Sequence, residues 1–270
     1  MTQNYGRGSK FIPPGQKNLH FDTEQKRKWV EKPSEYLQYR KDVEKELNIR
    51  FPLFVRDTAQ QAMAKEFTIK DMKARLAKKP ELQEKLLPSF AVGCRRPTPG
   101  TGYLEALCED NCEVVWGELE SFTETGIRSV DGTERDFDVI IAATGFDMSF
   151  IPRWPIIGNE GKNLQDEWKK NPVCYMSAIA KDMPNYFIYL GPGSPVGHGS
   201  IITSIERITL YLTDIITKLQ DENYTSFCIK SDKADSFQKQ MLTWLDKTVW
   251  GDNCQSSFKN GTKDGALHAL

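Results

Sequence analysis

The stretch that decides the fold is Asp138–Phe150, DVIIAATGFDMSF. Its first half, Val139–Ala143, is an unbroken apolar run that is too short for an ordinary helix and rich in β-branched residues. A strand buried on both faces of a parallel sheet has this pattern. Thr144 and Gly145 end the run, and a glycine at the carboxyl end of such a strand lets backbone approach a ligand. From these residues alone, a core strand followed by a tight turn is the simpler interpretation.

A β-hairpin is expected immediately before this strand. Ile127–Val130 and Thr133–Phe137 flank the dipeptide Asp131-Gly132, which two-residue hairpin turns favour. A hairpin that leads directly into DVIIAATGFD is a specific combination. It favours a strand whose carboxyl end approaches a ligand over a generic core strand.

An arginine pair lies in a second distinctive stretch, Gly93–Glu105, GCRRPTPGTGYLE. Arg95 and Arg96 stand at the edge of a segment rich in glycine and proline, where a pair of arginines can simply be solvated or salt-bridged. A rigid loop also holds a guanidinium in place, and an always-charged fork suits a phosphate or a developing oxyanion better than lysine does. Both interpretations are open from the residues alone.

The third stretch is Pro184–Ser200, PNYFIYLGPGSPVGHGS. Tyr186–Leu190 is expected to be another buried strand, followed by a glycine loop and by Ser200 at the start of a long helix, Ile201 to about Gln220. Exposed amides and the partial positive charge at that helix start would face whatever occupies the loop. The alternative is a helix N-cap without a ligand.

Together these motifs resemble the flavin-containing monooxygenases, and most closely the Baeyer–Villiger branch found in fungal secondary-metabolite pathways. The resemblance extends from about Trp29 to the last residue. It implies an α/β fold: an incomplete FAD/NAD(P)-binding Rossmann-like sheet with a β-hairpin layer and a helical N-terminal segment. Residues 1–90 would be a loop and the helical insertion of the NADPH domain, 91–137 the rest of that domain with the hairpin, and 138–270 the C-terminal half of the FAD-binding domain.

The resemblance also implies an activity and a site. FAD and NADPH would be the cofactors and a small-molecule ketone the substrate, with oxygen inserted next to the carbonyl through a flavin peroxide. Arg96 falls where these enzymes keep the arginine that stabilises the negatively charged flavin peroxide, a purely electrostatic role, and Arg95 matches their neighbouring basic residue. The residues implied to bind cofactor are Arg95, Thr144, Gly145, Phe146, Gly191, Pro192, Gly193, Ser194 and Pro195, and no metal is implied.

One expected element is absent from the 270 residues. Flavin monooxygenases need glycine-rich turns of the form G-x-G-x-x-G for the dinucleotide pyrophosphates, and neither Gly100–Glu105 nor Gly191–Val196 has that spacing. The Baeyer–Villiger fingerprint F-x-G-x-x-x-H-x-x-x-W is also missing. We therefore expect both pyrophosphate cradles to lie before Met1 or on a partner chain that supplies the missing Rossmann half. The alternatives are an inactive relic or accessory binding protein, or a non-redox binding domain.

Composition and charge limit the classes of partner and the cellular location that we expect. With 36 basic and 37 acidic residues, charge gives no reason to expect nucleic acid or an anionic membrane as a partner. No apolar run reaches the roughly 20 residues of a membrane span, and the N-terminus lacks the apolar core of a signal peptide. The six cysteines have no paired spacing, so we expect a cytoplasmic protein with reduced thiols and no zinc site.

Local signals predict several helices. Asp22 with Gln25 three residues later indicates the start of a helix, and Pro33 is expected to end it. Ser34 is expected to cap the next helix. Further helices are expected at about residues 57–78, at residues 163–170 with Trp168 as a core anchor, and at residues 232–250. The core residues expected in the last of these are Phe237, Met241, Leu245 and Trp250.

Overall fold

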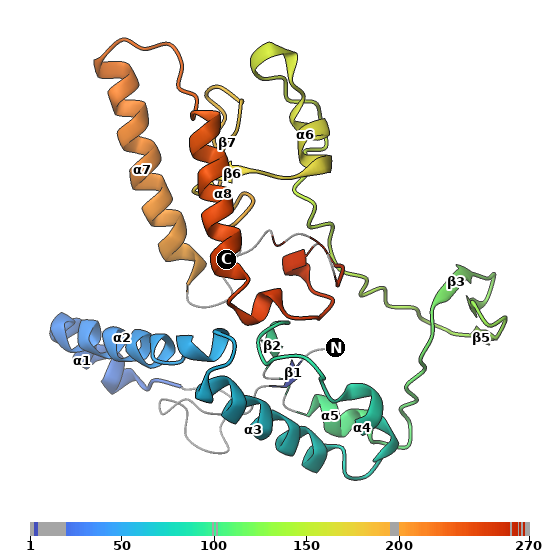
Figure 1. The fold of residues 1–270 in the computed structure, drawn as a ribbon. Coiled ribbons are helices and arrows are strands. Elements are labelled where there is room, and N and C mark those ends of the chain that lie inside the picture. The colour runs from blue at the N-terminus through green and yellow to red at the C-terminus, as the bar shows by residue number, and fades with distance from the viewer. Residues whose placement is uncertain are drawn as a thin grey trace.

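The computed structural model describes residues 3–4, 20–98, 100, 102–194, 200–259, 261–263, 265 and 267, with only the backbone for residues 3, 4 and 47. Figure 1 shows an N-terminal helical part (blue to teal), a small hairpin layer set apart from it (green), and a C-terminal part dominated by two long helices (orange to red). The predicted mixed α/β composition is confirmed, with three small sheets of two, three and two strands among the described residues.

The N-terminal part begins with two consecutive helices. Helix α1, Thr23–Glu31, is capped by Asp22, whose Oδ1 accepts a hydrogen bond from the Gln25 amide at 2.7 Å, as predicted. Helix α2, Pro33–Asn48, begins at its proline. The prediction that Ser34 caps this helix is therefore wrong, because proline suits the first helical position, where its missing N–H would have had no partner.

The rest of the N-terminal part contains one longer helix, α3, and several shorter helical elements. The 3-10 turn η1, Phe51–Phe54, precedes α3, Ala59–Arg75, which Thr58 caps through the Gln61 amide. Helices α4, Glu81–Leu86, and α5, Tyr103–Leu107, pack on α3 through an apolar cluster. The buried members of the cluster are Met72, Leu76, Leu82, Leu86, Leu104 and Cys108. Strand β1, Gln3–Asn4, pairs in parallel with β2, Pro97–Thr98.

The predicted hairpin is confirmed. Strands β4, Gly126–Ser129, and β5, Glu134–Asp136, are antiparallel, and the Asp131-Gly132 turn joins them. Gly132 has a φ of +87°, and the Asp131 carboxylate accepts a hydrogen bond from the Thr133 amide at 2.9 Å. A third strand that the sequence analysis did not predict, β3, Leu119–Phe122, pairs with the other side of β4.

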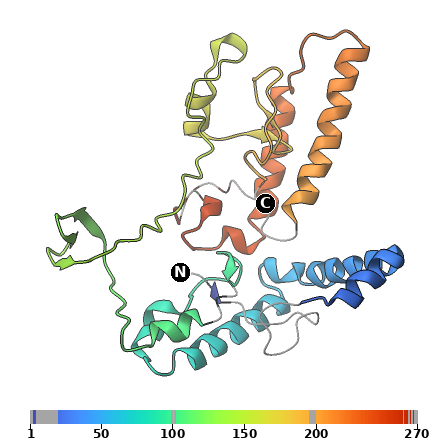
Figure 2. The same cartoon turned by 180° about the vertical axis from the view of Figure 1, so that it is seen from behind.

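The stretch predicted as the central buried strand is not a strand in this structure. Residues 138–147 form an extended connection between β5 and the C-terminal part, seen from both sides in Figures 1 and 2. Val139 is 76% exposed, Ile141 86% and Phe146 94%. A strand is defined by hydrogen bonds to a neighbour, and no described segment of this chain pairs with these residues. The apolar pattern is therefore present without the sheet that would bury it.

The C-terminal part contains two long helices and several short elements. It comprises η2 (Asn159–Gly161), α6 (Leu164–Lys170), β6 (Cys174–Tyr175), β7 (Ile179–Ala180), α7 (Ile201–Asp221), α8 (Ser231–Leu245), η3 (Val249–Gly251) and η4 (Ser257–Lys259). Trp168 is buried, as predicted. Ile208, Leu212 and Ile215 of α7 pack in the cluster that contains Ile179.

The second predicted buried strand, Tyr186–Leu190, is also wrong in this structure. A single isolated bridge, Ile179 to Phe187, is the pairing that these residues make within the described part of the chain. Most of their side chains are half-buried, because they pack beside α6 and α7 without a ladder on either edge.

One apolar core joins the N-terminal and C-terminal parts. Its buried members are Leu53, Phe54, Ala64 and Val92 from the first part, and Met241, Leu245, Val249, Trp250 and Phe258 from the second. A disulfide between Cys94 and Cys254 bridges the same two parts across 160 residues of sequence. The expectation that every cysteine is reduced is therefore wrong for Cys94 and Cys254. The sequence did not indicate this pair, because the two cysteines are far apart along the chain. Among the residues that the structure describes, no helix is long and apolar enough to cross a membrane.

Candidate functional site

The arginine pair lies on a tight loop between α4 and β2. Gly93, two residues before Arg95, has a φ of +94°, which residues with a side chain rarely adopt. A Cβ at this position would lie 2.9 Å from two ring carbons of Phe54, inside the shared core. Glycine is therefore required at this position for the loop to turn and to pack closely on Phe54.

The side chain of Gln61, on α3, forms hydrogen bonds with the backbone of this loop. Its side-chain Nε2 donates to the Val92 carbonyl at 2.9 Å, and its Oε1 accepts from the Val92 amide at 3.0 Å. The same Nε2 also donates to the Leu53 carbonyl. Gln61 is buried, so its amide satisfies backbone groups that have no access to water.

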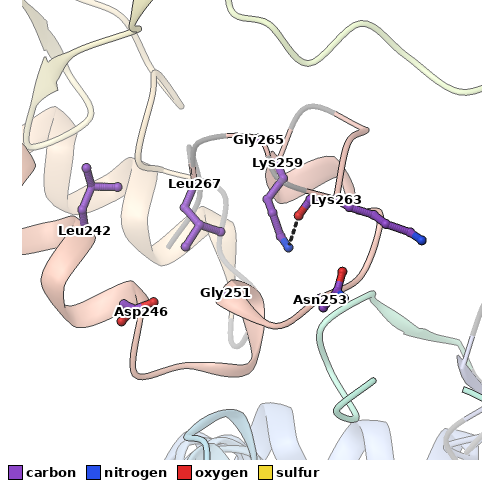
Figure 3. A pocket seen from close by; sticks show the side chains of 8 residues that line it. All are labelled: Leu242, Asp246, Gly251, Asn253, Lys259, Lys263, Gly265 and Leu267. Atoms are coloured by element: carbon purple, nitrogen blue, oxygen red, sulfur yellow. Dashed lines mark hydrogen bonds between the residues drawn. The ribbon is translucent and has the colours of Figure 1, made fainter. Parts of the chain in front are cut away.

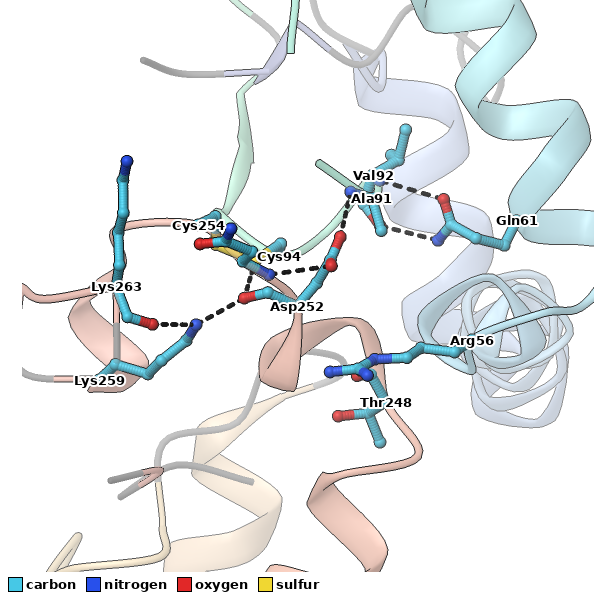
Figure 4. The surroundings of a disulfide bond; sticks show 11 residues. Arg56, Gln61, Ala91, Val92, Cys94, Thr248, Asp252, Cys254, Lys259 and Lys263 are labelled. Carbon is cyan, nitrogen blue, oxygen red and sulfur yellow. Dashed lines mark hydrogen bonds between the residues drawn. A yellow bond between two sulfur atoms is a disulfide. The ribbon is translucent and has the colours of Figure 1, made fainter. Parts of the chain in front are cut away.

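Asp252 holds the loop from the opposite side (Figure 4). Its Oδ2 accepts a hydrogen bond from the Ala91 amide at 2.7 Å, and its Oδ1 accepts from Asn253 at 2.9 Å. The backbone carbonyl of Asp252 accepts from the ammonium of buried Lys259, which also donates to the Lys263 carbonyl at 2.8 Å. A carboxylate that accepts backbone N–H bonds is a strong anchor, and the disulfide at Cys94 adds a covalent one.

The two guanidinium groups project from this anchored backbone. Arg95 is half-buried and Arg96 is exposed. Neither side chain makes a hydrogen bond or ion pair with another residue in the described part of the chain. Because neither guanidinium has an ion-pair partner among the described residues, both are available to bind an anionic group.

Arg75 fixes the far end of the same loop. Its Nη2 donates to the Gly100 carbonyl at 3.0 Å, and its Nε and Nη2 each bond one oxygen of Glu105 at 2.7 Å. This two-pronged hydrogen bond lowers the pKa of Glu105 from 4.5 to about 2 and raises the pKa of Arg75. A salt bridge was one of the two interpretations left open for Arg95 and Arg96, whereas the ion pair at this loop belongs to Arg75 of α3.

The predicted glycine loop forms a compact turn at Gly191–Ser194. The Ser194 amide donates to the Gly191 carbonyl, and the Gly191 amide donates to the Ser177 carbonyl, each at 3.0 Å. Gly193 has a φ of +85°, and a Cβ there would lie 2.7 Å from Met241 Sδ on α8. Pro192 is buried between these glycines. Pro195, the last predicted residue of this group, lies outside the described residues.

The predicted site residues fall into two groups: those of the arginine loop and the glycine turn, which α8 connects, and those of the exposed connection at residues 144–146. Met241 of α8 contacts the turn at Gly193 and belongs to the core that carries Val92, so α8 connects the glycine turn with the arginine loop. Thr144, Gly145 and Phe146 are exposed on the extended connection, and the structure does not bring them to either feature. Ser200 has the extended conformation of an N-cap before α7, as predicted, without a capping bond from its side chain.

A cavity of about 550 Å³ lies between the end of α8 and the C-terminal segment (Figure 3). Lysine, aspartate and asparagine side chains alternate with leucines and glycines in its lining: Leu242, Asp246, Gly251, Asn253, Lys259, Lys263, Gly265 and Leu267. None of these residues was predicted from the sequence, and neither were Gln61 and Asp252. No local motif marks such residues, because their roles depend on segments far away in the chain.

No protein-family model matches this chain. It is 36% identical over 238 residues to the FAD-binding monooxygenase stcW of Emericella nidulans, which covers 88% of this chain and 39% of that protein. It is 32% identical over 256 residues to the FAD-binding monooxygenase moxY of Dothistroma septosporum, covering 95% and 41%. A Baeyer-Villiger monooxygenase of Pseudomonas aeruginosa is 32% identical over 183 residues, covering 67% of this chain and 35% of that protein.

Solved structures show the same relationship at the level of the fold. Cyclohexanone monooxygenase from Rhodococcus sp. Phi1 bound to NADP+ matches 81% of this chain and 41% of its own with a TM-score of 0.69 at 23% identity. OTEMO in complex with FAD and NADP matches 80% and 41% with a TM-score of 0.68 at 24% identity. The chain thus spans about two fifths of the length of the fungal relatives and solved structures described here.

Proposed function

Starting from the premise that this chain is a homologue of FAD-binding monooxygenases that include Baeyer–Villiger enzymes, we propose that it forms the C-terminal part of such a monooxygenase. The proposed reaction inserts oxygen next to the carbonyl of a small-molecule ketone with FAD and NADPH as cofactors, in secondary-metabolite biosynthesis. In this proposal, residues 1–90 and 91–137 belong to the NADPH domain, and residues 138–270 to the FAD-binding domain.

The observation that carries this proposal is the anchored arginine loop. Arg95 and Arg96 follow a backbone held by Gln61, by Asp252 and by the Cys94–Cys254 disulfide. When bound, the flavin supplies the oxygen-activating chemistry. The part of Arg96 is to stabilise negative charge near the reacting atoms from a fixed position, so that little reorganisation is needed as the charge develops.

The residues present fit part of a flavin site. The two guanidiniums suit an anionic group, and the turn at Gly191–Ser194 has a glycine at a position where a Cβ would clash with Met241. A pyrophosphate cradle of the form G-x-G-x-x-G is not among the 270 residues. We therefore propose that a longer polypeptide, or a partner chain, supplies the cradle and also the strands against which Val139–Phe146 pair.

The exposed connection supports this arrangement. Val139, Ile141 and Phe146 are each more than three quarters exposed, and apolar residues of an incomplete sheet are costly to leave in water. The fungal relatives carry roughly three fifths of their length outside the matched region. That length is sufficient for a dinucleotide-binding unit, which needs on the order of 100–150 residues.

A second candidate function rests on the missing G-x-G-x-x-G motif. Without a cradle from elsewhere, the chain would be a catalytically inactive relic or an accessory binding protein derived from the same family. Purification from flavin-rich cells followed by a visible absorption spectrum separates the two. The monooxygenase proposal predicts that flavin is retained only when the complementary N-terminal part is present, whereas an accessory protein stays colourless in both cases.

The role of Arg96 has its own test. In the complemented enzyme, Arg96→Ala should lower kcat for ketone oxygenation by about 100-fold or more, as expected when one electrostatic group that stabilises a developing charge is lost. Arg27→Ala, at an exposed position of α1 with an ion pair to Glu31, is the matched control and should leave kcat unchanged. An Arg96→Ala enzyme with wild-type kcat would contradict the role assigned to Arg96.

A further inference from the structure

The disulfide lies immediately before the arginine pair. Cys94 precedes Arg95 in the chain, and its side chain is 0% exposed, while that of Cys254 is 1% exposed. The two Cα atoms are 6.4 Å apart, within the usual range for a disulfide. A covalent bond at this place connects the backbone of the loop with a turn that lies 160 residues further along the chain.

The turn on the other side of the disulfide also supplies Asp252. The Cys254 amide donates to the Asp252 carbonyl at 2.8 Å, and the Asp252 amide donates to the Val249 carbonyl at 3.1 Å, so both anchors belong to one small unit after η3. The carboxylate of Asp252 bonds Ala91 on one side of Gly93, and Cys254 bonds Cys94 on the other. If the disulfide opens, the hydrogen bond from the Ala91 amide to the Asp252 carboxylate still reaches the loop, and Cys94 Sγ lies within 3.5 Å of the Asp252 carbonyl. The side nearer the arginines then loses its covalent attachment.

We propose that the Cys94–Cys254 disulfide is a thiol-sensitive staple that holds the arginine loop in place, and that its reduction by a dithiol loosens residues 93–96. A thiolate of the dithiol attacks one of the two sulfurs and forms a mixed disulfide, and its second thiolate then displaces the remaining cysteine. Two electrons and two protons pass from the dithiol, which ends as a cyclic disulfide, while Cys94 and Cys254 end as thiols. Only the consequence for Arg96 rests on the proposed monooxygenase function.

Burial determines how this staple reacts. Because both sulfurs are out of contact with solvent, a reductant reaches them only when the loop or the turn after η3 opens locally. Internal exchange with Cys174 or Cys228 is disfavoured, since burial raises the pKa of both thiols and so lowers their thiolate fraction. The bond therefore resists reduction while the loop is closed, and a dithiol opens it through a locally opened state.

The test combines thiol counting with hydrogen exchange on the full chain. Alkylation of the denatured protein without reductant should label four cysteines, Cys108, Cys112, Cys174 and Cys228, and dithiothreitol should raise the count to six. Under native conditions, dithiothreitol should speed amide exchange at residues 93–96 by about tenfold or more, because an intact cross-link over so long a loop removes many open states.

Two double variants test whether the change in exchange rate comes from the Cys94–Cys254 disulfide. Cys94→Ser/Cys254→Ser should show the fast exchange without reductant and no further response to it. Cys112→Ser/Cys228→Ser, which changes two half-buried free cysteines, should respond as the unmodified protein does. Six labelled cysteines without reductant, or an unchanged exchange rate at residues 93–96 after complete reduction, would overturn the proposal. The unmodified protein decides the matter even if the first variant fails to fold.

The outcome also separates this proposal from the monooxygenase function. If reduction loosens the loop but Arg96→Ala leaves the complemented enzyme fully active, the staple exists and the catalytic role of the arginine is wrong. If Arg96→Ala is inactive and reduction does not change the exchange rate, the function holds and the staple has no effect on the loop.

Discussion

Gln61 and Val92 form a closed pair of hydrogen bonds between a side-chain amide and a backbone peptide group. The side-chain nitrogen donates to the carbonyl at 2.9 Å and the side-chain oxygen accepts from the amide at 3.0 Å. Both residues are buried, 31 positions apart in the chain. This pair attaches the arginine loop to α3. Three of the four predictions below concern this loop and its surroundings.

The first prediction concerns Gln61 itself. Gln61→Ala leaves the Val92 amide and carbonyl buried without these partners, so the free energy of unfolding should fall by about 1–3 kcal/mol. Gln60→Ala changes an exposed neighbour on the same helix and should alter stability by less than about 0.5 kcal/mol. Urea unfolding followed by circular dichroism measures both. Equal stabilities for the two variants would show that the amide pair does not anchor the loop.

The second prediction concerns pH. The pKa of Glu105 is lowered from 4.5 to about 2 by the hydrogen bonds from Arg75. A carboxylate with a lowered pKa in the folded state contributes stability above its unfolded pKa and loses it as the pH falls through the folded pKa. The stability difference between the unmodified protein and Glu105→Gln should therefore be full above pH 4.5 and shrink as the pH falls toward 2.

The expected size of this effect is small. The Glu105 side chain is 49% exposed, so solvent screening limits the pair to about 1 kcal/mol at most. Glu84→Gln, at an exposed position on α4, is the control for the loss of a surface carboxylate. Urea unfolding at several pH values measures both variants. A Glu105→Gln difference that is constant from pH 7 to pH 3 would contradict the assignment.

The third prediction concerns the exposed connection. Because Ile141 is 86% exposed, Ile141→Ser should change the stability of this chain by less than about 0.5 kcal/mol. The same change should weaken binding of the complementary N-terminal part, since the side chain would be buried only in the completed sheet. Ile179→Ser, at a position that is 1% exposed, should lower the free energy of unfolding by about 2–5 kcal/mol. Comparable losses for both variants would mean that Ile141 is already buried in this chain.

The fourth prediction concerns the disulfide and stability. Reduction should lower the free energy of unfolding by about 2–5 kcal/mol, because Cys94 and Cys254 close a long loop in the unfolded chain. Urea unfolding with and without dithiothreitol measures the change. The Cys94→Ser/Cys254→Ser variant should match the reduced protein under both conditions. A midpoint that does not depend on dithiothreitol would contradict a stabilising cross-link.

The sequence predicted the helices because their signals are local. Asp22 lies three residues from the amide that it caps, and Ser200 immediately precedes α7. The hairpin was predictable for the same reason, since Asp131-Gly132 specifies its own turn. Residues 139–143 and 186–190 have strand composition, but a strand also needs a neighbour. Among the described segments none supplies a ladder for either run.

Residues of the candidate site were proposed from the sequence only where a motif marks them. The Gly-Cys-Arg-Arg sequence and the turn at Gly191 point to a family resemblance, whereas Gln61 and Asp252 carry no such mark. Their hydrogen bonds to the loop cross 31 and 161 residues of sequence, and no periodicity or spacing connects positions so far apart. The Cys94–Cys254 pairing escaped prediction for the same reason.

The most direct measurement is a titration of FAD into this chain, alone and mixed with the part of the Emericella nidulans monooxygenase that lies outside the matched region. The account predicts no saturable binding at micromolar FAD by the chain alone, and a stoichiometric flavin spectrum for the mixture. The mixture prepared with Ile141→Ser should bind less flavin. Tight binding by the chain alone, or a mixture whose two parts remain separate and colourless, would contradict the claim that this chain is the C-terminal part of a flavin monooxygenase.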